Sequence, residues 1–107
     1  MNTFRCRIAT LGGVVFDEEV TSLYVPSSEG VLGILPNRVP IVASLTIKKG
    51  ILKATAWKEG DNEEEHIFVV DGGTLSAKRK ESIVLTKSCQ EFPSYEEALA
   101  SLQSPQS

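Results

Sequence analysis

The chain has 107 residues, which is enough for one domain with a hydrophobic core of its own. Charged residues make up 23 % of it and the formal net charge is −3, so the sequence lacks the basic character of nucleic-acid-binding proteins. No apolar run approaches the roughly 20 residues that cross a bilayer, and residues 1–10 include polar and charged residues where the apolar stretch of a signal peptide would lie. We therefore expect a soluble, unexported chain that binds no nucleic acid.

Extended segments dominate most of the chain. β-Branched and aromatic residues come in short runs bounded by Gly, Pro, Asp or Asn, which is typical of strands. The predicted strands are residues 4–9, 14–16, 19–25, 31–35, 39–47, 50–57, 65–70, 74–79 and 82–86. Short strands at this spacing predict an all-β fold, a two-sheet β-sandwich of about nine or ten strands.

Residues 25–42, VPSSEGVLGILPNRVPIV, contain closely spaced glycines and prolines. These are Pro26, Gly30, Gly33, Pro36 and Pro40. They divide the segment into short extended pieces joined by tight turns. The segment has one acid, Glu29, and one cation, Arg38, with no His or Cys, so we expect it to serve recognition and not catalysis.

A second turn signal lies at Asp71, Gly72 and Gly73, between the runs IFVV and TLSAKR. Residues that tolerate positive φ between two extended runs predict a β-hairpin. The first run is apolar throughout, which predicts a strand buried on both faces, whereas the second run alternates as a half-exposed strand does. We therefore place the core between two sheets.

The pattern changes to helical spacing near the C-terminus. Ser94 and Glu97 have the spacing of a capping box, and apolar residues recur at helical intervals up to Leu102. The sequence predicts one short C-terminal helix followed by a frayed end at residues 104–107. We divide the chain into a β-sandwich domain, residues 1–88, and a helical segment, residues 89–107.

Residues that often carry chemistry are isolated from suitable neighbours. His66, the only histidine, begins an apolar run, which favours a half-exposed strand position over a catalytic one. The acidic run 58–65, KEGDNEEE, lacks the ligand spacing of a calcium loop, so we expect a solvated hairpin loop and no metal. Cys6 and Cys89 are far apart and have no ligand cluster around them, which argues against a metal site. The sequence leaves a disulfide open, but we expect two free thiols that behave as small apolar residues in a reducing compartment.

The spacing P-x-x-E-G-x-x-G-I-L-P-x-x-x-P in residues 26–40 resembles a signature of the epsilon subunit of rotary F-type ATP synthases. GVVFDEEVTSLYVP from Gly13, GILKA from Gly50 and FVVDGGTLSAKRKESIVLT from Phe68 agree with the family in order and spacing. The resemblance implies a non-catalytic rotor subunit without a cofactor, at the foot of the central stalk. This subunit would bind the gamma subunit and the membrane ring of c subunits, and would couple ion flow to ATP synthesis. It would be peripheral on the cytoplasmic face of a bacterial inner membrane, held there by the complex.

The resemblance also implies which residues contact these partners. On the ring side they are Ser27, Ser28, Glu29, Gly30 and Val31. On the gamma side they are Thr10, Pro36, Arg38, Pro40 and Ala43. Many relatives have an acid at the position of Val31 and a histidine at that of Arg38, so we expect the ring contact to depend more on Glu29.

Family members usually continue into a two-helix hairpin that extends toward the catalytic head and inhibits hydrolysis. This chain is expected to stop after one helix, so we expect no inhibition by helix extension. In some relatives the hairpin begins with an ATP-binding motif whose arginine is Leu99 here, so we expect no nucleotide binding. The strand pattern also leaves open a β-sandwich recognition module of an unrelated complex. A third interpretation is an enzyme with a site assembled from distant carboxylates.

Overall fold

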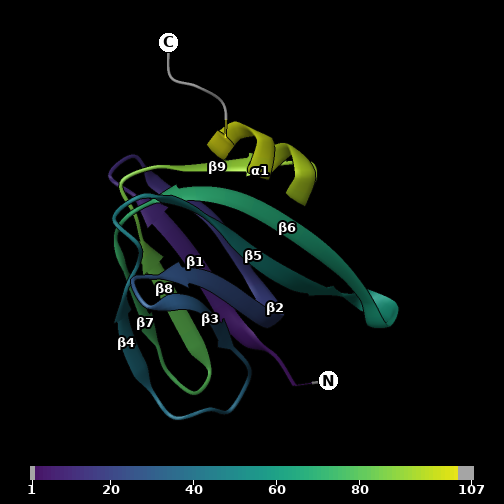
Figure 1. Cartoon of the computed structure of the whole chain (residues 1–107). Coiled ribbons are helices and arrows are strands. Elements are labelled where there is room, and N and C mark those ends of the chain that lie inside the picture. Colours follow the sequence, from purple (N-terminus) through teal and green to yellow (C-terminus); the bar gives the residue numbers. More distant parts are fainter. Residues whose placement is uncertain (1, 104–107) are drawn as a thin grey trace.

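The computed structural model describes residues 2–103, and the end predicted to be frayed, residues 104–107, lies outside the described residues. The strands are β1 (Phe4–Thr10), β2 (Gly13–Ser27), β3 (Gly30–Ile34), β4 (Ile41–Ser44), β5 (Lys49–Lys58), β6 (Asn62–Asp71), β7 (Thr74–Ala77), β8 (Glu81–Leu85) and β9 (Cys89–Phe92). A 3-10 turn, η1 (Glu59–Asp61), joins β5 to β6, and the helix α1 (Tyr95–Gln103) follows β9. The predicted all-β class with one short C-terminal helix is confirmed (Figure 1). Within residues 2–103, no helix combines the length and apolarity that membrane crossing requires.

The strands form one continuous sheet that folds over into a sandwich. Their order is β4-β7-β8-β1-β2-β5-β6-β9, and β3 pairs with β2 beside this path. The long strand β2 joins the layers, because its first half pairs with β1 and its second half with β3 and β5. At its end, Ser27 makes a β-bridge with Leu45, just after the edge strand β4. β2 therefore contacts both ends of the layer β4-β7-β8-β1: it pairs with β1 along its first half and reaches the residue after β4 at its end.

The core lies between the layers and extends under the helix. On β5, the alternate residues Leu52, Ala54 and Ala56 are buried, as expected of a strand with one core face. On β6, residues 67–70 are all buried, which confirms the strand predicted to be apolar on both faces. One β6 face points into the main core, and the other packs against Ala98 of α1.

The helix begins where the sequence predicted it. The N–H of Glu97 donates to the Ser94 hydroxyl at 3.2 Å, which satisfies one of the free donors at the helix N-terminus. α1 lies over β9 and β6 (Figure 1), where Leu102 packs with Ala98 on the outer face of β6. The helix is thus part of the packed domain.

Several strand boundaries differ from the prediction. The segments 14–16 and 19–25 form one strand, β2, because the acids between them pair with neighbouring strands: Asp17 with Arg5 and Glu18 with Lys58. β4 is confined to Ile41–Ser44 instead of residues 39–47. β9 was missed because its sequence, CQEF, lacks β-branched residues, and pairing with β6 supplies the order.

The hairpin predicted at the double glycine is wrong. Among the described strands, β6 pairs with β5 and β9, whereas β7 pairs with β4 and β8. Gly72 and Gly73 do adopt positive φ, 66° and 115°, but they turn the chain from one part of the sheet to another. A Cβ on Gly73 would lie 1.9 Å from the Leu85 carbonyl oxygen, so close backbone packing requires glycine here.

Both cysteines are free thiols. Cys6 is buried in the core, and burial raises the pKa of its thiol to about 12. Cys89 lies at the start of β9 and is half-buried, and burial raises its pKa to about 11. Neither thiol ionises near neutral pH, so both behave as small apolar side chains.

Candidate partner-binding surfaces

The predicted ring-side residues form the turn between β2 and β3, which its own side chains hold in shape. The Ser27 hydroxyl donates to the Gly30 carbonyl oxygen at 2.5 Å and accepts from the N–H of Glu29 at 3.2 Å. Gly30 has φ of 114°, a conformation that side chains disfavour. Glu29 is exposed, and Val31 is 76 % exposed. The turn therefore presents one carboxylate and one valine to solvent on a fixed backbone.

This turn is also anchored to the edge strand β4. The N–H of Ser28 donates to the Ser44 carbonyl oxygen at 3.0 Å, and the N–H of Thr46 donates to the Pro26 carbonyl oxygen at 2.8 Å. The turn and β4 line one shallow hollow, and its β4 wall includes Val42 and Ala43. Ala43, which was predicted on the gamma side, therefore lies beside the ring-side turn.

The loop between β3 and β4 carries three of the predicted gamma-side residues, Pro36, Arg38 and Pro40. Arg38 is half-buried and donates from Nη1 to the carbonyl oxygen of Gly33, so part of its guanidinium serves to hold the loop against β3. Asn37 has φ of 63°, and its N–H donates to the Arg79 carbonyl oxygen at 3.2 Å. These contacts fix the loop next to the β7–β8 connection.

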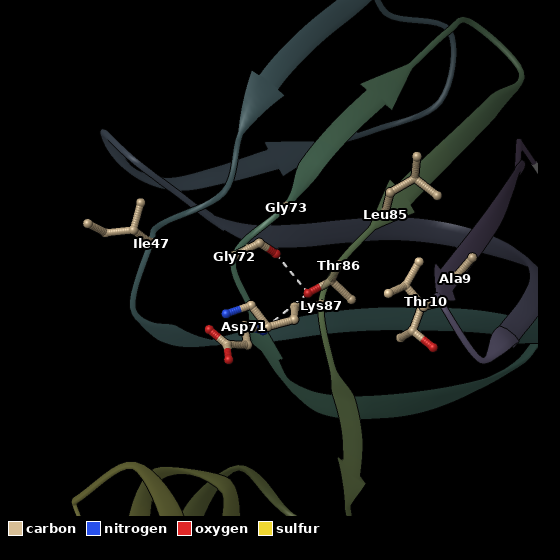
Figure 2. A pocket seen from close by; sticks show the side chains of 10 residues that line it. Ala9, Thr10, Ile47, Asp71, Gly72, Gly73, Leu85, Thr86 and Lys87 are labelled. Atoms are coloured by element: carbon tan, nitrogen blue, oxygen red, sulfur yellow. Dashed lines mark hydrogen bonds between the residues drawn. The ribbon is translucent and has the colours of Figure 1, made fainter.

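Thr10 lies elsewhere, in a hollow at the C-terminal end of β1 (Figure 2). Its hydroxyl accepts from the N–H of Gly12 at 3.1 Å. Leu11 and Ile47 also line this hollow, and they are 102 % and 90 % exposed. The hollow therefore has a strongly apolar rim.

Thr86 also lines this hollow, and the sequence pattern did not identify it as a site residue. Its hydroxyl donates to the Gly72 carbonyl oxygen at 2.7 Å and accepts from the N–H of Asp71 at 3.1 Å (Figure 2). A buried threonine at the end of an alternating strand was the available signal, but its partners are 14 and 15 residues away in sequence.

The predicted gamma-side residues thus do not form one patch. The N–H of Arg5, near the start of β1, donates to the Lys80 carbonyl oxygen at 2.9 Å, which places that end of β1 near the Arg38 loop. Thr10 ends the same strand. A strand of this length spans about 20 Å, so Thr10 and Arg38 belong to opposite ends of the layer.

Several charged residues of the described chain form ion pairs with neighbouring strands. Within residues 2–103, no three His, Cys, Asp or Glu side chains gather in a way that could hold a metal ion. Arg5 Nε lies 2.6 Å from Asp17 Oδ1, and this hydrogen bond lowers the pKa of the Asp17 carboxyl. A general acid at neutral pH needs the opposite shift, so Asp17 has a structural role.

Comparison with known proteins identifies the family. The model of the ATP synthase delta/epsilon chain β-sandwich domain matches residues 3–91. The chain belongs to this family. The ATP synthase epsilon chain of Alkalihalophilus pseudofirmus is 35 % identical over 94 residues, which cover 88 % of this chain and 65 % of that relative. The epsilon chain of Leptospira interrogans is 36 % identical over 85 residues, or 79 % of this chain and 61 % of that relative. The chain therefore spans less than two thirds of the length of these epsilon chains.

Two solved structures contain chains that share this fold. The first is a chain of the Euglena gracilis mitochondrial ATP synthase, in a structure of OSCP, F1 and c-ring, with a TM-score of 0.74. The match has 19 % identity and covers 94 % of this chain and 61 % of that one. The second, from the central stalk and c-ring of Tetrahymena thermophila mitochondrial ATP synthase, has a TM-score of 0.63 and 14 % identity and covers 94 % and 87 % of the two chains.

Proposed function

We propose that this chain is a non-catalytic rotor subunit in the central stalk of an F-type ATP synthase. It links the gamma subunit to the ring of c subunits and couples ion flow to ATP synthesis. The observation that carries the proposal is the family match over residues 3–91, because it includes every strand of the sandwich except the last residue of β9. The epsilon-chain relatives support the same assignment.

The ring contact is proposed at the turn formed by Ser27, Ser28, Glu29, Gly30 and Val31. The hydrogen bonds within the turn and to β4 fix the position of its backbone. The exposed Glu29 carboxylate suits a partner loop that offers a cation or N–H donors. The exposed Val31 suits some apolar surface on the same loop. Val42, which is 79 % exposed on the adjoining β4, extends the apolar part of this contact.

The gamma contact is proposed at two separate places, the Arg38 loop with Pro36 and Pro40, and the hollow around Thr10. With two contacts at opposite ends of one layer, the subunit cannot turn about either contact alone. The continuous sheet between them, with β2 shared by both layers, provides the stiffness that transmission of torque requires. Ala43 joins the ring-side surface in this arrangement.

The helix α1 is proposed to stay docked on the sandwich and not to inhibit hydrolysis. Ala98 is fully buried against Ile67 and Val69, and Leu102 packs beside them. Leu99 offers no cation for a nucleotide phosphate. The helical segment therefore supports the sandwich instead of binding ATP. We place the subunit at the cytoplasmic face of a bacterial inner membrane, attached through the complex.

The direct test is affinity purification. The full chain, tagged at its C-terminus, is expressed in its native cells and recovered from gently solubilised membranes, and the co-purified proteins are identified by mass spectrometry. The gamma subunit, the c subunits and the catalytic head are expected. The same tag on an unrelated soluble protein is the control. Recovery of an unrelated partner without these subunits would overturn the proposal.

A further inference from the structure

Three consecutive cations form the connection between β7 and β8. Lys78, Arg79 and Lys80 are all exposed, and their side chains form no hydrogen bond or ion pair with any other described residue. The cations on the strands differ: Arg5 Nε and Lys58 Nζ each lie 2.6 Å from a carboxylate oxygen. The connection therefore presents positive charge that is left without an ion-pair partner within residues 2–103.

The backbone of this connection is held by two neighbouring segments. The N–H of Arg5, near the start of β1, donates to the Lys80 carbonyl oxygen at 2.9 Å. The N–H of Asn37, in the loop between β3 and β4, donates to the Arg79 carbonyl oxygen at 3.2 Å. An ordered backbone loses little freedom when a partner binds, so more of the interaction energy remains as affinity. The cations are thus presented in a fixed place.

The loop between β3 and β4 adds another cation and two apolar side chains beside this connection. Leu35 is 52 % exposed and Val39 is 78 % exposed. Arg38 is half-buried, and its guanidinium donates to the Gly33 carbonyl oxygen. The loop and the connection both lie at the lower end of the molecule in Figure 1. We call Leu35, Arg38, Val39 and residues 78–80 the basic end of the sandwich.

Acids near the basic end do not balance its charge. Asp17 and Glu19 of β2 face Arg5, with oxygens 2.6 and 3.6 Å from its guanidinium nitrogens. Glu81, which begins β8, is exposed and contributes one anion next to three cations in sequence. The basic end is therefore positive on a chain whose formal net charge is −3.

This combination favours an acidic protein segment as the partner. A nucleic acid or an anionic membrane presents its charge over a broad surface and therefore meets the negative charge of the whole chain. A short acidic segment meets only the local charge, because screening limits its field to about 10 Å in 0.1 M salt. Leu35 and Val39 also suit a protein, since protein interfaces combine an apolar centre with a charged rim.

We propose that the basic end binds an acidic segment of the gamma subunit. Carboxylates of that segment pair with Lys78, Arg79 and Lys80, and its apolar side chains cover Leu35 and Val39. Arg79 suits a carboxylate particularly well, because a guanidinium donates two parallel N–H groups to it. The inference rests on the proposed function for the identity of the partner. It adds the β7–β8 connection to the gamma contact and assigns a charge to the surface that meets it.

Zero-length cross-linking tests this contact in the assembled complex. The tagged full chain is recovered from gently solubilised membranes and treated with a carbodiimide, which joins a lysine amine to a carboxylate in direct contact. We expect mass spectrometry to find Lys78 or Lys80 joined to an Asp or Glu of the gamma subunit. The internal control is the amide between Lys58 and Glu18, whose side chains lie 2.6 Å apart. If the control forms and neither lysine is joined to gamma, the proposal is wrong.

Removing the charge tests its contribution to binding. Lys78→Gln combined with Lys80→Gln should lower the recovery of the gamma subunit by about fivefold in about 0.1 M salt. The difference should shrink toward about 1 M salt, where charges are screened within about 3 Å. Lys53→Gln combined with Lys58→Gln is the matched control, because it removes the same charge from exposed ion pairs on β5. Equal recovery of gamma from the two double variants would overturn the proposal.

The same preparations separate this inference from the rotor role. If the unaltered chain recovers no gamma subunit, the proposed function fails. If the unaltered chain and the variant altered at Lys78 and Lys80 recover gamma equally, only the basic end is removed from the contact. Sedimentation with phosphatidylserine vesicles tests a lipid partner, and we expect the full chain to stay in solution. Sedimentation with the vesicles that this variant loses would assign the basic end to the membrane and contradict the proposal.

Discussion

Two glycines with almost the same φ serve different purposes. Gly30, in the turn between β2 and β3, has φ of 114°, and Gly73, in the corner after β6, has φ of 115°. A Cβ on Gly73 would lie 1.9 Å from the Leu85 carbonyl oxygen, whereas a Cβ on Gly30 would have nothing within 4 Å. Close backbone packing therefore requires glycine at position 73, whereas only the positive φ favours glycine at position 30. A glycine motif in the sequence therefore identifies a conformation, but not whether it serves the fold or a surface.

The largest effect is expected at the corner. Gly73→Ala should lower the free energy of unfolding by at least about 3 kcal/mol, because the methyl group overlaps backbone atoms and the φ value is unfavourable. Urea unfolding followed by the fluorescence of Trp57 measures this loss. Failure to obtain folded protein counts as the same result, whereas a loss no larger than that of Gly30→Ala would contradict the comparison.

A smaller effect is expected at the turn. Gly30→Ala meets only the conformational penalty, so it should lower the free energy of unfolding by about 1–2 kcal/mol and leave the sandwich intact. Circular dichroism and the same urea titration report these two quantities. If Gly30→Ala abolished folding, the turn would be coupled to the core more strongly than its surroundings indicate.

A weaker effect still is expected from the surface pair of Arg5 and Asp17. Their hydrogen bond lowers the pKa of Asp17 in the folded protein, so the stabilisation is present above the pKa of the unfolded chain and is lost as the pH falls through the folded value. Asp17→Asn should therefore reduce stability slightly at neutral pH and make no difference in strong acid. Urea titrations at several pH values test this, with Glu59→Gln as a control of equal charge change. A deficit that persisted in strong acid would contradict this account.

No effect on stability is expected at Glu29, which is exposed and forms no side-chain hydrogen bond or ion pair among the described contacts. Glu29→Gln should change the free energy of unfolding by less than about 0.5 kcal/mol. It should nevertheless reduce the recovery of c subunits in the affinity purification, because the proposed ring contact loses its charge. Glu81→Gln, also exposed, is the matched control. Equal recovery from both variants would remove Glu29 from the interface.

Most of the fold could be predicted from the sequence, and the errors have one cause. Local composition identified the strand-forming runs and the helix cap at Ser94. The pairing of distant strands decided the rest. Asp17 remains inside β2 because Arg5 and Arg7 face it, and β9 is ordered by β6. The corner at Gly73 has turn residues, but its strands find partners elsewhere.

The candidate surfaces were predictable only in part. The turn at residues 27–31 could be located because its shape depends on nearby residues, chiefly Ser27 and Gly30. Its attachment to β4 could not, because the contact from Ser28 to Ser44 depends on the closing of the sandwich. The separation of Thr10 from Arg38 follows from the length and direction of β1, which no local pattern reveals.

The most direct test of the central claim is site-specific cross-linking in native membranes. A photoreactive amino acid replaces Val31 in one full-length variant and Glu59, at the tip of the β5–β6 hairpin, in another. The rotor account predicts a cross-link between position 31 and a c subunit, with none from position 59. Cross-links from position 31 only to proteins outside the ATP synthase, or to c subunits equally from both positions, would contradict it.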